Sequence, residues 1–319
     1  YDLPNDTVYA ETCASIGLIF FARRMLELEP KGEYADVMER ALYNTTLAGM
    51  ALDGRRFFYV NPLESAPGIA GEAATQRHAL PQRPQWYACA CCPPNVARLL
   101  ASIGSYAFSA GENTLFLHTY LDGRLESPFG WAMRCETGYP HDGRVSCTFL
   151  DPAETTVALH IPAWSRRTVL LHNGKEVDLS GVVREGYAYI SGTFAPGDKL
   201  ELVLDMEPRK VYASQRVPAD SGRAAVQRGP LVYCAEGADN GGEVFSLSLD
   251  REGGLRELAF DPTLLGGVAP VVAQGWRTEA IKELYTSCRP VRVPAEVRLI
   301  PYYAWANRGL NQMRVGLPV

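Results

Sequence analysis

The sequence has little histidine, no excess of positive charge and no long apolar run. Its 36 acidic residues outnumber 31 lysines and arginines, which gives a formal net charge of −5. Nucleic acids and anionic membranes attract a basic protein face, so this balance argues against either as the main partner. A membrane-spanning helix needs about 18 consecutive apolar residues, and no run approaches that length, so we expect no membrane partner.

The chain also lacks an initiator methionine, a signal-like segment, internal repeats and low-complexity tracts. A chain without its natural start would look the same, and we take a cytoplasmic location as the expectation. The five histidines show no paired spacing that would suggest a metal site; they are His78, His118, His141, His160 and His172. With 319 residues, of which 47% are hydrophobic, the chain is long enough for two or three folded domains.

The eight cysteines are unevenly spread. Three of them fall in the segment Cys89-Ala90-Cys91-Cys92, and Cys13 lies about eighty residues earlier. The other four stand singly in strand-like surroundings, and we expect them to be buried small apolar side chains; they are Cys135, Cys147, Cys234 and Cys288.

The first hundred residues are predicted to be helical. Ala10–Phe21 is apolar on nearly every side, and Tyr34–Leu42 has apolar residues at helical spacing. A third helix is expected after Pro93-Pro94, because proline suits a first turn. The segment 56–83 is a long stretch rich in proline, glycine and alanine, and loops of this length in compact domains are usually functional.

Strand patterns begin after about Phe108. Six short runs are β-branched or alternating: Thr114–Tyr120, Val145–Leu150, Thr156–Ile161, Thr168–His172, Tyr187–Ile190 and Leu200–Leu204. Asn173-Gly174 is a strong hairpin signal. We therefore predict a multidomain α+β chain, with metal-binding helices in residues 1–108, an antiparallel β-sandwich in 109–223 and a second β-rich domain in 224–319.

The predicted helices carry more apolar surface than three helices can bury among themselves. Ala10–Phe21, apolar all round, requires cover on every side. Either the chain forms a homo-oligomer through these helices, or further helices precede Tyr1 and cover them.

The cysteine clusters suggest a metal site. Zinc in proteins is usually bound by four ligands in a tetrahedron, and the set Glu11, Cys13, Cys91 and Cys92 would supply them. Mixed thiolate and carboxylate ligands favour zinc over calcium or magnesium. Glu11 and Cys13 would point apart on a regular helix, so both can reach one ion only if the helix starts around them. Three other interpretations stay open: a Cys89/Cys92 redox pair, a purely structural zinc, and Glu11 as an ordinary carboxylate at a helix start.

Five segments in the same order resemble glycoside hydrolase family 127, the β-L-arabinofuranosidase family. They are Glu11-Thr12-Cys13-Ala14-Ser15-Ile16-Gly17, Phe58-Tyr59-Val60-Asn61-Pro62-Leu63, Cys89-Ala90-Cys91-Cys92-Pro93-Pro94-Asn95, Arg228-Gly229-Pro230-Leu231-Val232-Tyr233 and Tyr302-Tyr303-Ala304-Trp305-Ala306-Asn307-Arg308-Gly309. The combination of the second cysteine cluster with the upstream Glu-Thr-Cys is far more specific than a lone pair of cysteines.

The resemblance implies that the helices are the C-terminal part of an (α/α)6 barrel, followed by β-sandwich domains. It also implies a Zn²⁺ ion held by Glu11, Cys13, Cys91 and Cys92. Cys91 would be the nucleophile of a retaining mechanism with a thioglycosyl intermediate, and Tyr59 would contact the sugar. Cys89 is not expected to bind the metal. The general acid/base glutamate of the family lies shortly before the segment at which this chain begins, so we expect the chain alone to be inactive.

Two functions therefore remain open. The first is a hydrolase, or part of one, that acts on β-L-arabinofuranosides or related glycosides. The second is a non-catalytic carbohydrate-binding or structural module that zinc stabilises.

Overall fold

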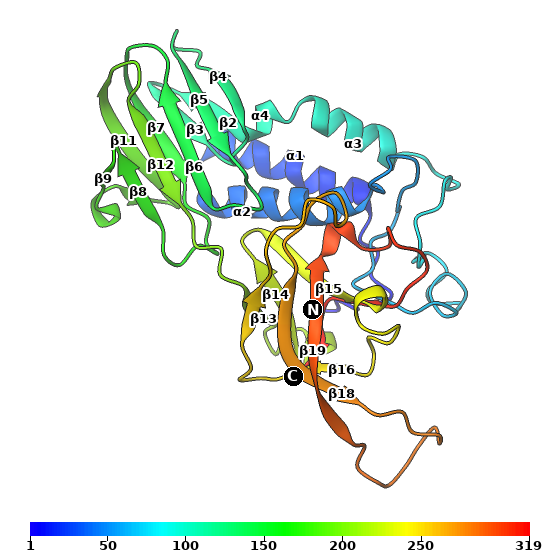
Figure 1. The fold of residues 1–319 in the computed structure, drawn as a ribbon. Coiled ribbons are helices and arrows are strands. Elements are labelled where there is room, and N and C mark those ends of the chain that lie inside the picture. Colours follow the sequence, from blue (N-terminus) through cyan, green and yellow to red (C-terminus); the bar gives the residue numbers. More distant parts are fainter. The chain divides into compact units, whose positions relative to one another are not determined.

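A computed structural model describes residues 1–319, and the chain divides into two compact units (Figure 1). Unit 1 comprises Tyr1–Ser15, Asn44–Pro94 and Glu207–Val319; unit 2 comprises Ile16–Tyr43 and Asn95–Met206. The expected multidomain chain with both helices and sheets is confirmed at this level.

Four α-helices lie in the first third of the chain. They are α1 (Thr12–Leu28), α2 (Gly32–Arg40), α3 (Cys92–Ala101) and α4 (Gly104–Ala107), and α2 continues as a π-helix over Ala41–Thr46. The three predicted helices are confirmed, but α1 runs further and α3 begins earlier than predicted. Both prolines of α3 fit in its first turn, because backbone N–H groups there have no partner within the helix. Four helices do not confirm the (α/α)6 barrel.

Unit 2 contains two packed sheets. The five-stranded sheet consists of β2 (Phe108–Gly111), β3 (Thr114–Leu117), β7 (Ala153–His160), β10 (Val183–Arg184) and β11 (Tyr187–Phe194). The six-stranded sheet consists of β4 (Gly123–Glu126), β5 (Ala132–Thr137), β6 (Arg144–Phe149), β8 (Val169–His172), β9 (Lys175–Glu176) and β12 (Lys199–Val203). Buried apolar side chains from both sheets form one core between them.

Each of the six predicted strand runs overlaps an observed strand. The hairpin signal is also confirmed, because Asn173 and Gly174 join β8 to β9 with φ angles of +51° and +74°. Positive φ at both central residues is what a type I′ turn requires. One pairing differs from the expected antiparallel pattern: β3 and β7 run parallel.

The burial predicted for the four single cysteines is confirmed for Cys135, Cys147 and Cys234 and wrong for Cys288, and two of the buried ones are not free thiols. Cys135 and Cys147 face each other on β5 and β6 and form a disulfide, with their Cα atoms 4.1 Å apart. Cys288 is exposed. Cys234 alone is a buried free thiol as predicted. The disulfide depends on the register of two strands, which composition does not reveal.

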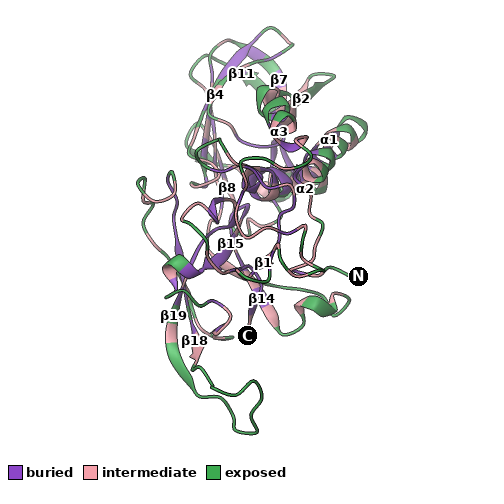
Figure 2. Cartoon of the chain, turned by 90° about the vertical axis from the view of Figure 1, so that its right-hand side faces the viewer, coloured by how far each residue is buried: buried purple, intermediate pink, exposed green.

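Unit 1 is built on a ten-stranded sheet. Its strands are β1 (Glu64–Ser65), β13 (Arg209–Tyr212), β14 (Arg223–Arg228), β15 (Leu231–Glu236), β16 (Leu247–Leu249), β17 (Leu255–Glu257), β18 (Val271–Thr278), β19 (Arg292–Pro301), β20 (Met313–Arg314) and β21 (Leu317–Pro318). Figure 2 shows that the hairpin between β18 and β19 is exposed. β1, which lies in the segment after Tyr59, joins this sheet by pairing antiparallel with β20.

Candidate metal centre

The metal-ligand candidates Glu11 and Cys13 lie on either side of a helix start. Glu11 forms an isolated antiparallel bridge with Val60, and α1 begins at the next residue, Thr12. The backbone therefore changes from extended to helical between the two ligands. This change satisfies the condition under which two side chains at i and i+2 can reach one ion.

Thr12 fixes this change of direction. Its amide donates to the carbonyl of Tyr59 at 3.0 Å, and its hydroxyl donates to the carbonyl of Phe58 at 2.9 Å. The side chain of Asn61 donates to the Thr12 hydroxyl at 2.9 Å and to the Ala10 carbonyl at 3.0 Å. Thr12 and Asn61 are both completely buried. Hydrogen bonds of these buried residues thus hold the segment that carries Glu11 and Cys13 against residues 58–61.

Cys91 and Cys92 come from the start of α3 and complete the cluster. The four candidate ligand atoms of Glu11, Cys13, Cys91 and Cys92 all lie within 4.8 Å of one another. The Cys13 and Cys92 sulfurs are 3.8 Å apart, the Cys91 and Cys92 sulfurs 3.7 Å, and the Cys91 sulfur is 3.7 Å from Glu11 Oε1. Two sulfurs bound to one tetrahedral zinc at about 2.3 Å would lie about 3.8 Å apart. The side chains are therefore spaced for a single tetrahedral ion.

The protonation of these thiols depends on what binds beside them. Burial raises the pKa of the Cys91 thiol, and hydrogen bonds with Cys13, Cys89 and Cys92 raise it further. Burial also raises the pKa of Cys92, to about 12. The start of α3 is therefore not enough to make thiolates at neutral pH, whereas a bound divalent cation lowers thiol pKa values strongly.

The long loop that carries the second cysteine cluster is anchored by a buried arginine. Arg83 donates to the carbonyls of Ala48, Trp305 and Tyr303, and its guanidinium lies 4.6 Å from the centre of the Phe58 ring. Burial lowers the Arg83 pKa to about 10, so the side chain remains charged at neutral pH. Arg83, the last residue of the loop expected over 56–83, thus fixes the chain that leads to the second cysteine cluster.

Tyr59, the predicted sugar-contacting residue, lies at the edge of the cluster. The pKa of its hydroxyl is raised above the usual value, mainly by the neighbouring Tyr9 hydroxyl and then by burial and the Glu11 carboxylate. Its ring stacks on Tyr87 with centroids 5.2 Å apart. Cys89 is exposed and forms a hydrogen bond with Cys91, but it is not one of the four clustered candidates.

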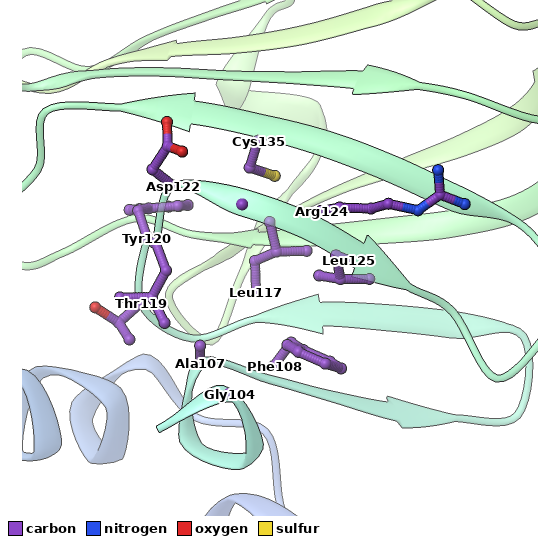
Figure 3. Close-up of a pocket in the computed structure, with 12 residues that line it drawn as sticks. Gly104, Ala107, Phe108, Leu117, Thr119, Tyr120, Asp122, Arg124, Leu125 and Cys135 are labelled. Carbon is purple, nitrogen blue, oxygen red and sulfur yellow. The ribbon is translucent and has the colours of Figure 1, made fainter. Parts of the chain in front are cut away.

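A cavity in unit 2 does not resemble a sugar site. It has a volume of about 150 Å³, below the roughly 300 Å³ at which small-molecule pockets begin. Figure 3 shows Phe108, Leu117 and Leu125 among its lining side chains, with Cys135 of the disulfide nearby. No helix in the structure combines the length and the apolar character that a bilayer span requires.

The sequence prediction missed the residues that position the ligands. Thr12 and Asn61 both fall in motif segments, but nothing in their spacing shows that they bond to each other. Tyr9 and Tyr87 were missed too, although each is a tyrosine within four residues of a candidate ligand. The presence of an aromatic residue close to a ligand motif in the sequence could have identified both tyrosines.

Comparison with known families gives three matches along the chain. Residues 1–105 match the model described as "Beta-L-arabinofuranosidase, GH127 catalytic domain". Residues 114–206 match the GH127 middle domain, and residues 208–318 match the glycoside hydrolase family 127 C-terminal domain.

Individual relatives agree with these matches. The non-reducing end beta-L-arabinofuranosidase of Bifidobacterium longum subsp. longum is 42% identical over 333 residues, covering 99% of this chain and 50% of that protein. The crystal structure of a GH127 beta-L-arabinofuranosidase from Geobacillus stearothermophilus T6 is similar with a TM-score of 0.95 and 45% identity, over 99% of this chain and 51% of that one. The GH127 beta-arabinofuranosidase BT3674 has a TM-score of 0.89 and 34% identity, over 100% of this chain and 51% of that one. The chain thus spans about half the length of these relatives.

Proposed function

Because this chain belongs to glycoside hydrolase family 127, we propose that it serves the hydrolysis of β-linked L-arabinofuranosides or related glycosides. The observation that carries the proposal is the convergence of Glu11, Cys13, Cys91 and Cys92 on one point. The relatives that share the chain's sequence are described as β-L-arabinofuranosidases, which gives the substrate class.

Zinc is the metal that this ligand set favours. Three sulfurs and one carboxylate suit a borderline-soft ion, and the observed spacings of 3.7 and 3.8 Å between sulfurs fit a zinc tetrahedron. A zinc ion bound there would keep the neighbouring cysteines deprotonated at neutral pH.

We assign the nucleophile to Cys91 rather than Cys92. Cys92 is completely buried, whereas Cys91 is partly exposed and lies 3.7 Å from the Glu11 carboxylate. Of the two adjacent thiols only Cys91 can meet a substrate from solvent. We propose that Tyr59, which precedes the Glu11 bridge partner Val60, contacts the same sugar.

The proposed reaction proceeds in two displacements. The Cys91 thiolate attacks the anomeric carbon while a carboxylic acid protonates the departing glycosidic oxygen, which gives a thioglycosyl intermediate and a free alcohol. Water then attacks the same carbon, gives its proton to the carboxylate and releases the sugar and the thiolate. On the basis of the family resemblance, we propose that a glutamate of the complete gene product is that acid. The resemblance also supports our proposal that the four helices belong to an (α/α)6 barrel. A cytoplasmic location stays an expectation from the sequence alone.

Metal analysis of purified protein tests the site. We expect one zinc per chain in the unmodified protein and in Cys89→Ser, and a loss of zinc in Cys92→Ser. Equal zinc in all three proteins would contradict the ligand assignment. Cys89→Ser is a matched control because it removes a thiol of the same segment that lies outside the cluster.

The nucleophile is tested by labelling in the complete gene product that carries this sequence. A cysteine-directed arabinofuranose electrophile should modify Cys91, as located by mass spectrometry, and Cys91→Ser should abolish hydrolysis of an aryl β-L-arabinofuranoside. An adduct on Cys89 would refute the assignment. Stoichiometric zinc without hydrolysis or labelling would favour the non-catalytic module.

A further inference from the structure

A row of four aromatic rings extends from the metal centre, and the proposed reaction uses only one of them. Tyr87 stacks on Tyr59 with an interplanar angle of 12°, and Tyr59 meets Tyr9 edge to face with centroids 6.0 Å apart. Tyr9 in turn lies 5.7 Å from the His78 ring. We call Tyr87, Tyr59, Tyr9 and His78 the aromatic row.

Tyr9 is exposed and yet held in place. Its side chain is 61% exposed, although it is large and partly apolar. Its ring contacts the Tyr59 and His78 rings, and the backbone on both sides is bonded: the His78 ring nitrogen Nε2 contacts the Thr7 carbonyl at 3.1 Å, and Asn61 donates to the Ala10 carbonyl. A ring that is fixed and open to solvent loses little conformational freedom when it binds a partner.

The position of Tyr9 in the row indicates which part of a substrate it meets. Tyr59 precedes Val60, the bridge partner of the candidate metal ligand Glu11, whereas Tyr9 meets the Tyr59 ring edge to face and is more exposed. A glycoside whose terminal sugar is attacked at Cys91 must extend its leaving group toward solvent. The negative face of an aromatic ring attracts the positively polarised C–H groups of a sugar.

We propose that Tyr9 is a stacking platform for the sugar ring on the leaving-group side of the scissile bond. This inference rests on the proposed glycosidase function and names a binding residue for it. Tyr9 would bind by its ring face, and its hydroxyl would hold Tyr59 in position. The ligand class is a second sugar joined to the terminal arabinofuranose.

A comparison of two substrates tests the proposal in the complete zinc-loaded gene product. One substrate is a disaccharide in which β-L-arabinofuranose is joined to a second arabinose, and the other is methyl β-L-arabinofuranoside. Stacking of aromatic groups contributes about two- to tenfold to an equilibrium constant. In Tyr9→Ala, kcat/KM for the disaccharide should therefore fall about two- to tenfold more than kcat/KM for the methyl glycoside.

Two variants separate stacking from positioning. Tyr9→Phe keeps the ring and removes only the hydroxyl beside Tyr59, so it should retain the wild-type ratio between the two substrates. Tyr285→Ala removes a tyrosine that is also exposed, in the hairpin between β18 and β19, and should also keep that ratio. Equal losses on both substrates in Tyr9→Ala would mean that Tyr9 acts only through Tyr59, and the platform would be refuted.

A binding measurement distinguishes failure of the platform from failure of the proposed function. Line broadening of the C–H proton signals of free arabinose should be observed with the wild-type protein and with Tyr9→Phe, and should be reduced in Tyr9→Ala. No broadening with the wild-type protein would overturn the platform. Broadening that depends on Tyr9, in a protein that hydrolyses neither substrate, would support the platform and contradict the glycosidase.

Discussion

The side chain of Asn61 donates a 2.9 Å hydrogen bond to the hydroxyl of Thr12, the residue that separates Glu11 from Cys13. Neither residue is a metal-ligand candidate, and both are completely buried. Groups that orient metal ligands without touching the metal often decide how tightly the metal binds. The affinity of the cluster therefore depends on bonds that the four candidate ligands do not make themselves.

Thr12→Val should weaken zinc binding. Valine keeps the shape of threonine but cannot donate to the Phe58 carbonyl or accept from Asn61, which leaves buried polar groups unpaired. We expect the free energy of unfolding in EDTA to fall by about 1–3 kcal/mol and the zinc affinity to fall about 10- to 100-fold. Urea unfolding and competition with a chromophoric chelator measure the two effects.

The matched control for Thr12→Val is Thr155→Val. Thr155 is also buried and donates to a backbone carbonyl, that of Asn113, within unit 2. It should lose comparable stability and keep the wild-type zinc affinity. If both variants kept that affinity, the orienting role of Thr12 would be wrong.

Gly49→Ala should also disturb the start of α1, because the new methyl group would press against the side chain of Thr12. A Cβ atom at position 49 would lie 2.5 Å from Cγ2 and 2.7 Å from Oγ1 of Thr12, closer than van der Waals contact allows. We expect a loss of about 1–3 kcal/mol in the free energy of unfolding, with weaker zinc binding. Gly17→Ala is the contrast, because Gly17 lies within α1 with no atom within 4 Å of its new Cβ, and alanine should stabilise that helix by about 0.5–1 kcal/mol. Equal zinc affinities in Gly49→Ala and Gly17→Ala would show that the clash with Thr12 does not affect zinc binding.

A buried carboxyl in unit 2 gives the protein a specific pH dependence. Burial raises the pKa of Glu39 above its usual value near 4.5, although the neighbouring His160 and hydrogen bonds from Tyr139 and Trp164 act in the opposite direction. The folded state therefore holds this proton more tightly than the unfolded state. The contribution of Glu39 to the free energy of unfolding falls as pH rises from about 4.5 to its folded pKa, by about 1.4 kcal/mol per pH unit.

Glu39→Gln removes this titration. The free energy of unfolding of the variant should rise relative to the wild type between pH 4.5 and the folded pKa, and stay level above it. Urea unfolding at a series of pH values measures the difference, with Glu33→Gln, an exposed position on the same helix, as the control. If the free energy of unfolding of Glu39→Gln fell relative to the wild type as pH rises, the predicted direction would be wrong.

The sequence singled out the four clustered residues because the chemistry of thiols restricts what they can do, whatever the fold. Cys91-Cys92 with Glu11 and Cys13 form an unusual pattern that few functions other than metal binding explain. The need for a helix start at Glu11 could also be deduced, since two side chains at i and i+2 otherwise diverge. The partners of Thr12 could not be deduced, because they come from a segment nearly fifty residues away.

Strand existence was predictable from local pattern, whereas strand pairing was not. Thr114–Tyr120 and Thr156–Ile161 showed their β character in their own residues, but their parallel pairing depends on the path of the whole chain. The same is true of Cys135 and Cys147, whose disulfide follows from the register of β5 against β6. A contact that depends on the register of two strands cannot be predicted from the sequence around either residue alone.

Exposed apolar residues on α1 predict that the isolated chain self-associates. Leu18, Phe21 and Leu28 lie on one face of this helix and are all exposed. Exposed apolar surface costs about 25 cal/mol per Å² when it could be buried, so the isolated chain should self-associate through this face. Light scattering should show dimers or larger species for the wild type and a monomer for the double variant Leu18→Glu/Phe21→Glu, with the same zinc content. Leu284→Glu, which changes an exposed leucine of the β18–β19 hairpin, should leave the association intact. A monomeric wild type would show that this face of α1 does not drive association, and dissociation caused by Leu284→Glu alone would place the interface on the hairpin instead.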